Sequence, residues 1–232
     1  MDAGGKMDNT DIELAEKLAS TKLYSKLTPE EILSLISGRN GYLRKWRRGD
    51  ILVREGDEIP DIDVIISGEL SVERIFRDGT RSQVHYLKAG SIVGLEALGE
   101  AGYRSLYYYT AAKDIFMFCL PMADVQKSGR IPEEIRLKIM NNVLNVLSHE
   151  NNRQRQRVDI LSVSGLRERI LIYLYYQQKK ENSNSIYLHY TREEMASYLC
   201  VNRSSLSREL SQMQKEGILS IRENHFILKQ IL

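Results

Sequence analysis

The chain has 232 residues, of which 42% are hydrophobic and 28% are charged, and its formal net charge is +2. This composition is typical of a globular protein with one large or two smaller domains, and we expect two. No segment approaches the roughly 18 consecutive apolar residues of a membrane-spanning helix, so we expect a cytoplasmic protein. The two cysteines, Cys119 and Cys200, exclude a disulfide framework or a cysteine-rich metal or cluster site, and we expect both to be small buried side chains.

The N-terminal part of the chain reads as a β-barrel preceded by helix. Residues 28 to 31, Thr-Pro-Glu-Glu, are typical of a helix start, with a capping threonine and proline at the first helical position. From 43 to about 118 the sequence changes to short runs of β-branched and aromatic residues separated by glycine-containing turns. Regular turns between short strands indicate an all-β sandwich or barrel.

A long helix is expected after the barrel. Pro132 and two glutamates open it, and apolar residues recur at steps of three and four. We interpret this stripe as a contact surface for a second copy of the chain, with packing on the chain's own barrel as the alternative. The residues of the stripe are Ile135, Ile139, Val143, Val146 and Leu147.

The C-terminal part begins after a short segment, residues 161–165, whose small hydroxyl residues and glycine suit a hinge. A helix is predicted from Leu166 to about Gln178. The net charge is −2 over residues 1–130 and +3 over residues 165–232, a gradient that weakly favours a C-terminal contact with nucleic acid. The fold class is therefore α+β, with a barrel domain (1–130), a dimerisation helix (131–160), the hinge and a C-terminal domain (166–232).

A helix-turn-helix motif is predicted within residues 191–216. Thr191 and Glu194 form a capping box, and Asn202 is a good N-cap for the second helix. On that helix the apolar residues share one face, while the opposite face carries short hydroxyls and arginines. Short hydroxyls allow close approach to the floor of the major groove, and arginines are bidentate donors to guanine. The DNA-binding residues we predict are Thr191, Arg192, Asn202, Arg203, Ser204, Ser207, Arg208 and Ser211, and the segments ILSIR and HFILK predict the hairpin of a winged helix.

Over nearly its full length the chain resembles the family of the cyclic-AMP receptor protein and the fumarate-nitrate regulator. The segment TREEMASYLCVNRSSLSRELSQMQKEGIL carries this resemblance most specifically, and RRGDILVREGDEIPDIDVIISGEL supports it. The resemblance implies a jelly-roll barrel, a homodimer on an inverted-repeat DNA operator, and contact with RNA polymerase if the protein activates transcription. It also implies that positions 203, 204, 207 and 208 face bases and that positions 191 and 192 touch phosphate. Two departures are Ser204, where the family usually has glutamate, and Cys200, where many members have glycine.

The resemblance also implies an effector pocket in the barrel, formed by Gly94, Leu95, Glu96, Arg104 and Ser105, with Asn151 and Asn152 on the long helix. Members that bind cyclic nucleotides hold the sugar with a glutamate, but here Leu95 stands at that position and Glu96 is displaced by one residue. We therefore favour a small-molecule effector other than cyclic AMP, with cyclic AMP itself and no effector as the alternatives. The two asparagines are equally suited to bind a ligand or to pair across a dimer seam.

Iron-sulfur, haem and metal-enzyme chemistries each require cysteine or histidine ligands. An iron-sulfur sensor needs four cysteine ligands, a haem sensor needs axial ligands, and a metal enzyme on a cupin-like barrel needs two or three histidines. The barrel has one histidine, His85, so we expect no catalytic residue and no metal site. The alternative that remains is a ligand-binding or protein-interaction module of the same fold that no longer recognises DNA specifically.

Overall fold

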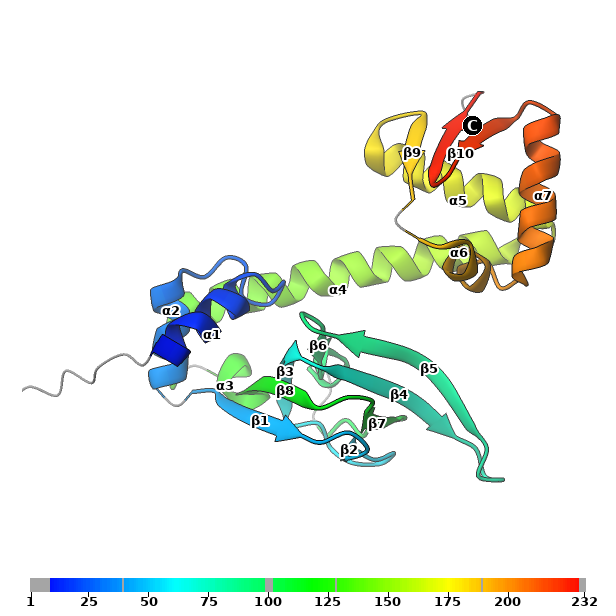
Figure 1. The fold of residues 1–232 in the computed structure, drawn as a ribbon. Helices are drawn as coiled ribbons and strands as arrows, with labels where there is room; N and C mark the ends of the chain where they lie inside the picture. Colours follow the sequence, from blue (N-terminus) through cyan, green and yellow to red (C-terminus); the bar gives the residue numbers. More distant parts are fainter. Residues whose placement is uncertain (1–8, 39, 99–101, 128, 189, 230–232) are drawn as a thin grey trace, which may run out of the picture. The chain divides into compact units, whose positions relative to one another are not determined.

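The computed structural model describes residues 9–38, 40–98, 102–127, 129–188 and 190–229 (Figure 1). Its contacts divide the chain into two units, Met1–Leu147 and Ser148–Leu232, which are described separately below. One helix, α4 (Glu133–Ser162), contributes to both units. Among the described residues, no helix combines the length and apolarity needed to cross a bilayer.

The first unit is a barrel of two four-stranded antiparallel sheets. The strand orders are β1-β8-β3-β6 and β2-β7-β4-β5. The strands are β1 (Tyr42–Trp46), β2 (Ile51–Val53), β3 (Asp61–Ser67), β4 (Glu69–Ile75), β5 (Arg81–Lys88), β6 (Ile92–Val93), β7 (Tyr108–Ala111) and β8 (Ile115–Pro121). Between the sheets lies one hydrophobic core, in which Val64 on β3 pairs with Phe118 on β8.

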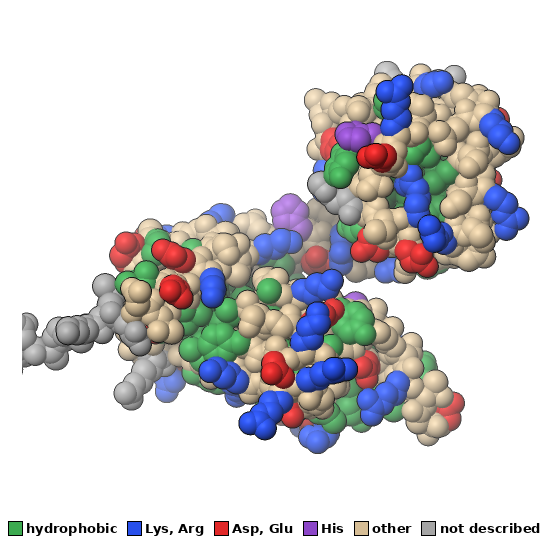
Figure 2. Space-filling view, in the orientation of Figure 1, with side chains coloured by type: hydrophobic (Ala, Val, Ile, Leu, Met, Phe, Trp, Pro, Cys, Tyr) green, Lys and Arg blue, Asp and Glu red, His purple; other side chains and the backbone are tan. Residues whose placement is uncertain are grey.

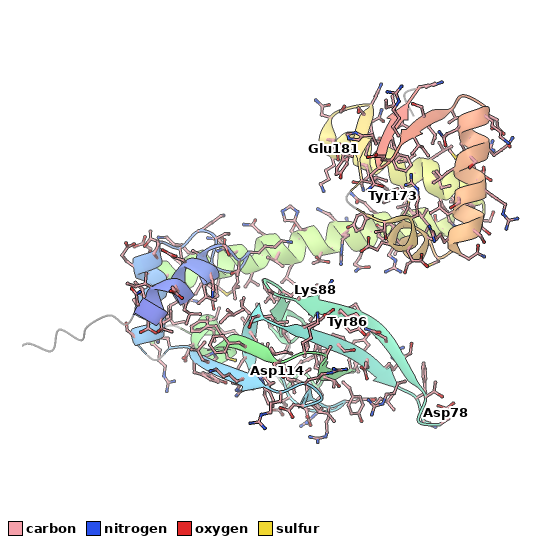
Figure 3. The ribbon with its side chains drawn as sticks, in the orientation of Figure 1. Asp78, Tyr86, Lys88, Asp114, Tyr173 and Glu181 are labelled. Carbon is pink, nitrogen blue, oxygen red and sulfur yellow. The ribbon has the colours of Figure 1, made fainter. Side chains whose placement is uncertain are left out.

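Three short helices cover this barrel, namely α1 (Asn9–Ala19), α2 (Pro29–Ser37) and α3 (Met122–Gln126), and a single 3-10 turn spans Leu95–Ala97. At the start of α2 the capping box is complete: Thr28 Oγ1 accepts the Glu31 amide, and Glu31 accepts the Thr28 amide at 2.9 Å. The β4–β5 hairpin extends from the barrel, with Asp78 at its tip and Tyr86 and Lys88 on β5 (Figure 3).

The apolar stripe of α4 packs mainly on its own unit. Ile135, Ile139 and Val143 are buried in the core of the barrel unit, and the Asn142 side chain donates to the Leu23 carbonyl at 2.9 Å. The interpretation of these three residues as a contact surface for a second copy is therefore wrong. They are covered because this face of the helix belongs to the hydrophobic core of the barrel unit.

The second unit combines the end of α4 with three helices and a small sheet. The elements are α5 (Leu166–Glu181), β9 (Ser185–Tyr187), α6 (Arg192–Tyr198), α7 (Arg203–Lys215), β10 (Leu219–Arg222) and β11 (His225–Leu228), and the sheet order is β10-β11-β9. Tyr173, labelled on α5 in Figure 3, is buried and packs its ring 5.5 Å from that of Tyr198 on α6. The predicted hairpin is present, with its turn at Glu223 and Asn224.

The predicted hinge is shorter than the sequence indicated. Helix α4 continues through Ser162, so only residues 163–165 connect it to α5 without helical structure. Two contacts hold the last turn in place: Ile160 is buried in the core of this unit, and Tyr176 Oη donates to Asp159 at 2.7 Å. Of the predicted hinge, residues 161–165, the first two therefore belong to the packed end of α4.

Candidate nucleic-acid interface

Helices α6 and α7 are joined by a tight turn, and each helix begins at a residue whose side chain caps it. Thr191 Oγ1 accepts the Glu194 amide, and Glu194 accepts the Thr191 amide at 2.7 Å. At the start of α7, Asn202 Oδ1 accepts the Ser205 amide at 2.8 Å. These caps satisfy amides that have no partner within the helix, so both helix starts are fixed where the sequence predicted them.

The two faces of α7 have different roles. Leu206, Leu210 and Met213 are buried in the core of the second unit. The opposite face is exposed and consists of Arg203, Ser204, Ser207, Arg208 and Ser211. Figure 2 shows Lys and Arg side chains over the α7 side of this unit. The structure thus brings five of the predicted DNA-binding residues onto one accessible surface, which we call the reading face.

Side chains on the reading face make few strong contacts with the protein. Ser204 Oγ donates to Asn202 Oδ1 at 2.8 Å, and Ser211 Oγ donates to the Ser207 carbonyl at 2.9 Å. Arg208 Nε lies 3.5 Å from the Ser204 carbonyl oxygen, and Arg203 Nε lies 3.8 Å from Glu193, both at the outer edge of bonding distance. The two guanidinium groups are therefore accessible donors, whereas Asn202 acts mainly as a helix cap.

Arg192 lies beside the hairpin of the winged helix. Its Nη2 donates to the Glu223 carbonyl at 3.0 Å, and its guanidinium lies 4.7 Å from the centre of the Phe226 ring. Burial lowers the pKa of Arg192 from its ordinary value. The side chain thus ties α6 to the hairpin, a contact that the sequence spacing did not reveal.

Cys200 corrects one expectation from the sequence. Cys119 is buried as predicted, but Cys200 is exposed, because its neighbour Leu199 fills the interior and Cys200 forms the outside of the turn. Its φ of 55° lies in the left-handed region, which is costly for a residue with a Cβ. The backbone of this turn is therefore strained at Cys200, a position where glycine would adopt the same φ without cost.

Arg169 is a further residue of this unit that was not predicted. Its Nε donates to the Val163 carbonyl at 2.9 Å and its Nη1 to the Leu199 carbonyl at 3.2 Å. One side chain thus joins the connection before α5 to the end of α6. Sequence spacing gives no signal for such a contact, because its partners are backbone carbonyls.

In the barrel, the predicted effector residues fall into two groups. Gly94 has a φ of 93°, and a Cβ there would collide with the Asp61 carbonyl oxygen, so only glycine fits this turn. Next to it, Leu95 is half-buried and Glu96 accepts a hydrogen bond from Tyr109 Oη at 2.6 Å. Burial, followed by the nearby Glu96 charge, raises the pKa of Tyr109.

The second group lies at the loop before β3. Arg104 donates to the Gly56 carbonyl at 2.9 Å and pairs with Glu58 at 3.2 Å. Ser105 is buried, and its hydroxyl exchanges hydrogen bonds with the backbone of Tyr107. Both side chains thus already have protein partners. Asn151 and Asn152 lie in the other unit and are exposed on α4.

A cavity of about 150 Å³ lies inside the barrel. It is acidic: Asp61 accepts from Tyr42 Oη and lies 3.4 Å from Arg44, while Asp63 Oδ1 is buried without a hydrogen-bond partner among the described residues. Burial raises the pKa of Asp63 to about 6. A hydrogen bond with the Cys119 thiol lowers it, but this effect is smaller. The lining residues are Arg44, Trp46, Leu52, Val53, Glu58, Ile59, Pro60, Asp61, Asp63, Leu70, Val93, Tyr109 and Met117. No group of three or more His, Cys, Asp or Glu side chains in the described ranges is arranged to hold a metal ion.

Comparison with known proteins agrees with both units. A family model described as Crp-like helix-turn-helix domain matches residues 168–231, and one described as Cyclic nucleotide-binding domain matches residues 43–128. The fumarate and nitrate reduction regulatory protein of Escherichia coli K12 is 23% identical over 190 residues, which are 79% of this chain and 73% of that protein.

Solved structures show the same fold at low sequence identity. The catabolite activator protein of Thermus thermophilus is 20% identical with a TM-score of 0.51, and the match covers 91% of this chain and 95% of that one. The protein CprK, complexed with OCPA, is 19% identical with a TM-score of 0.56, covering 85% and 92%.

A helix-turn-helix domain joined to a cyclic-nucleotide-binding-type barrel defines a DNA-binding transcription regulator rather than an enzyme. Both domain matches and the curated fumarate and nitrate reduction regulators point to one family. The chain belongs to the CRP/FNR family of bacterial transcription regulators.

Proposed function

We propose that this regulator is a homodimer that binds an inverted-repeat operator through the reading face of α7. The observation that carries this proposal is the exposed cluster of two arginines and three serines opposite a buried apolar face. In this reading Arg203 and Arg208 donate to guanine N7 and O6, and the serines allow close approach to the groove. Thr191 and Arg192, at the start of α6, are proposed to lie near the phosphate backbone, where the contact of Arg192 with the hairpin positions α6 and the hairpin together.

A heptad pattern on α4 supports the dimer. Leu137, Leu144, Asn151 and Val158 recur every seven residues, which are the a positions of a coiled coil. The three apolar members are 49%, 60% and 68% exposed, which is costly for aliphatic side chains unless a partner covers them. The d positions are Met140, Leu147, Gln154 and Leu161. We call these a and d positions the α4 seam, and we propose it as the dimer contact in place of Ile135, Ile139 and Val143, which pack on the barrel.

The polar residues of the seam favour a parallel pair in register. Glu150 and Arg155 occupy successive g and e positions, so each Glu150 faces an Arg155 of the second copy when two helices lie parallel. Asn151 occupies an a position, where asparagine selects dimers and fixes the register. We therefore assign Asn151 to the seam, whereas Asn152, at the following b position, lies outside it.

We propose further that the barrel binds a small neutral or cationic molecule instead of a cyclic nucleotide. The cavity is smaller than the roughly 300 Å³ at which typical ligand pockets begin. Its carboxylates repel a phosphate, and Arg104 already pairs with Glu58. A ligand with a hydrogen-bond donor supplies a partner for Asp63 Oδ1.

Selection from a pool of randomised DNA tests the proposed DNA function. The protein is expected to enrich an inverted repeat, and its binding is expected to weaken by orders of magnitude between about 50 and 200 mM salt, because several phosphates are neutralised. The alternative, a module that no longer reads DNA, predicts no enriched sequence. As a regulator of bacterial type the protein is proposed to act in the cytoplasm, with RNA polymerase as a partner if it activates.

A further inference from the structure

Arg167, in the first turn of α5, contacts α7 at two separate points. Its Nε donates to Glu209 Oε1 at 2.7 Å, and its Nη1 and Nη2 donate to the two oxygens of Glu216 at 2.6 and 3.1 Å. Glu216 also accepts from Gln212 Nε2 at 2.8 Å. A guanidinium that makes three bonds to two carboxylates holds one orientation, because its donors form a rigid planar fork.

The spacing of the two carboxylates determines what these bonds restrain. Glu209 lies on α7 and Glu216 is its C-cap residue; they are seven residues apart, close to two helical turns, so both lie on one side of α7 roughly 10 Å apart along the axis. That face adjoins the buried apolar face and lies about a quarter turn from Arg208. The apolar face of α7 is already packed in the core, and two polar contacts along the adjoining edge add a restraint on the roll and tilt of the helix.

Charge gives these contacts a second consequence. Hydrogen bonds from Arg167 lower the pKa of Glu216, and the two glutamates raise the pKa of Arg167. Without Arg167, α7 would carry two unneutralised carboxylates beside a surface that must approach DNA phosphates. Arg167 therefore both orients α7 and removes a repulsive charge from its flank.

We propose that Arg167 is a positioning residue for DNA recognition: through Glu209 and Glu216 it sets the roll of α7 on α5, and so aligns the reading face with base edges. This inference rests on the proposed DNA function. The Arg167, Glu209 and Glu216 side chains are each about a quarter to a third exposed, so solvent screens their charges, and we expect the effect in sequence discrimination more than in folding.

Three variants separate positioning from direct contact: R167Q, the double variant E209Q/E216Q, and the triple variant that combines them. The measured quantity is the ratio of Kd for scrambled DNA to Kd for the operator that the wild-type protein enriches. We expect this ratio to fall about fivefold or more in R167Q and in E209Q/E216Q, and no further in the triple variant, since all three lose the same contacts. R136Q is the matched control, because Arg136 forms a similar two-point pair with Glu133 in the barrel unit.

The outcomes are distinct. An unchanged ratio in R167Q overturns the proposal. A ratio that falls in R167Q but not in E209Q/E216Q also overturns it, since Arg167 would then act through its own contact with DNA. If R167Q does not fold, E209Q/E216Q decides alone, because its new glutamines are similar in size and partly exposed. If the wild-type protein enriches no sequence, the proposed function itself fails.

Discussion

In the proposed function, individual side chains on α7 divide between those that stabilise the helix and those that contact DNA. Asn202 accepts hydrogen bonds from Ser204 and from the Ser205 amide, so it serves the helix start. Arg203 and Arg208 have only marginal contacts with the protein and are exposed. The short side chain of Ser204 allows the helix to approach the groove closely, but it has no carboxylate that could accept a hydrogen bond from cytosine N4. Base discrimination is therefore assigned mainly to the arginines.

Replacement of Arg208 tests this assignment. Arg208→Ala is expected to cost about 1 to 3 kcal/mol of operator binding and to relax one base position, because a bidentate guanine contact is lost. Fluorescence anisotropy with operator and scrambled DNA measures the change. Lys180→Ala, which removes one positive charge from the exposed end of α5, is the control. An Arg208→Ala protein with an unchanged operator-to-scrambled ratio would show that Arg208 does not read bases.

The buried carboxyl of Asp63 predicts a pH dependence of stability. Burial raises its pKa to about 6 in the folded protein, so the folded state binds a proton that the unfolded chain releases near pH 4. The free energy of unfolding should therefore fall as pH rises from about 4 to 6 and be constant above. Asp63→Asn should remove this slope and raise the free energy of unfolding at pH 7 by on the order of 3 kcal/mol.

Urea unfolding at pH 5 and pH 7.5 measures the effect. Glu55→Gln, at an exposed loop position, is the control and should keep the wild-type slope. An Asp63→Asn protein with the full wild-type slope would contradict the assignment of this pH dependence to Asp63.

Two substitutions of Cys200 are expected to change the free energy of unfolding in opposite directions. Since its φ is 55°, Cys200→Gly should raise the free energy of unfolding by up to about 1 kcal/mol, and Cys200→Val should lower it, because a β-branched residue fits this conformation poorly. Thermal unfolding under reducing conditions measures both. Equal melting temperatures for the two variants would show that the turn carries no strain.

At the scale of the elements, the sequence predicted the features that depend on neighbouring residues, namely helix starts and helix faces. Capping boxes located α2 and α6, and the periodicity of α7 separated its buried face from its reading face. The sequence did not show which side of α4 packs on the barrel, because two apolar stripes run along one helix and only tertiary contacts select between them. The contacts of Arg167, Arg169 and Arg192 were missed for the same reason, since their partners lie on distant elements.

The exposed seam of α4 gives a prediction at this scale. Leu144→Glu should weaken self-association by at least tenfold, because a charge at an a position is buried in the dimer without a partner. Asn145→Glu, at the adjacent b position, is the matched control and should leave the dimer intact. Sedimentation equilibrium measures both. A Leu144→Glu protein that associates like the wild type would exclude this seam.

At the scale of the whole molecule, three parts of the chain contribute to the proposed function. The barrel contains a small acidic cavity, α4 carries a heptad seam, and α7 presents arginines and serines. The proposed parallel dimer supplies two reading faces, and two faces require two half-sites. Under the same proposal, an effector bound in the barrel acts by changing how the paired helices hold the two DNA-binding units.

Footprinting of the protein on its selected operator tests this account most directly. The predicted result is two protected half-sites in inverted orientation, with centres one helical turn or about 34 Å apart, and loss of both in the Leu144→Glu variant at the same protein concentration. A single protected half-site, or protection independent of the α4 seam, would contradict the dimeric reading of DNA.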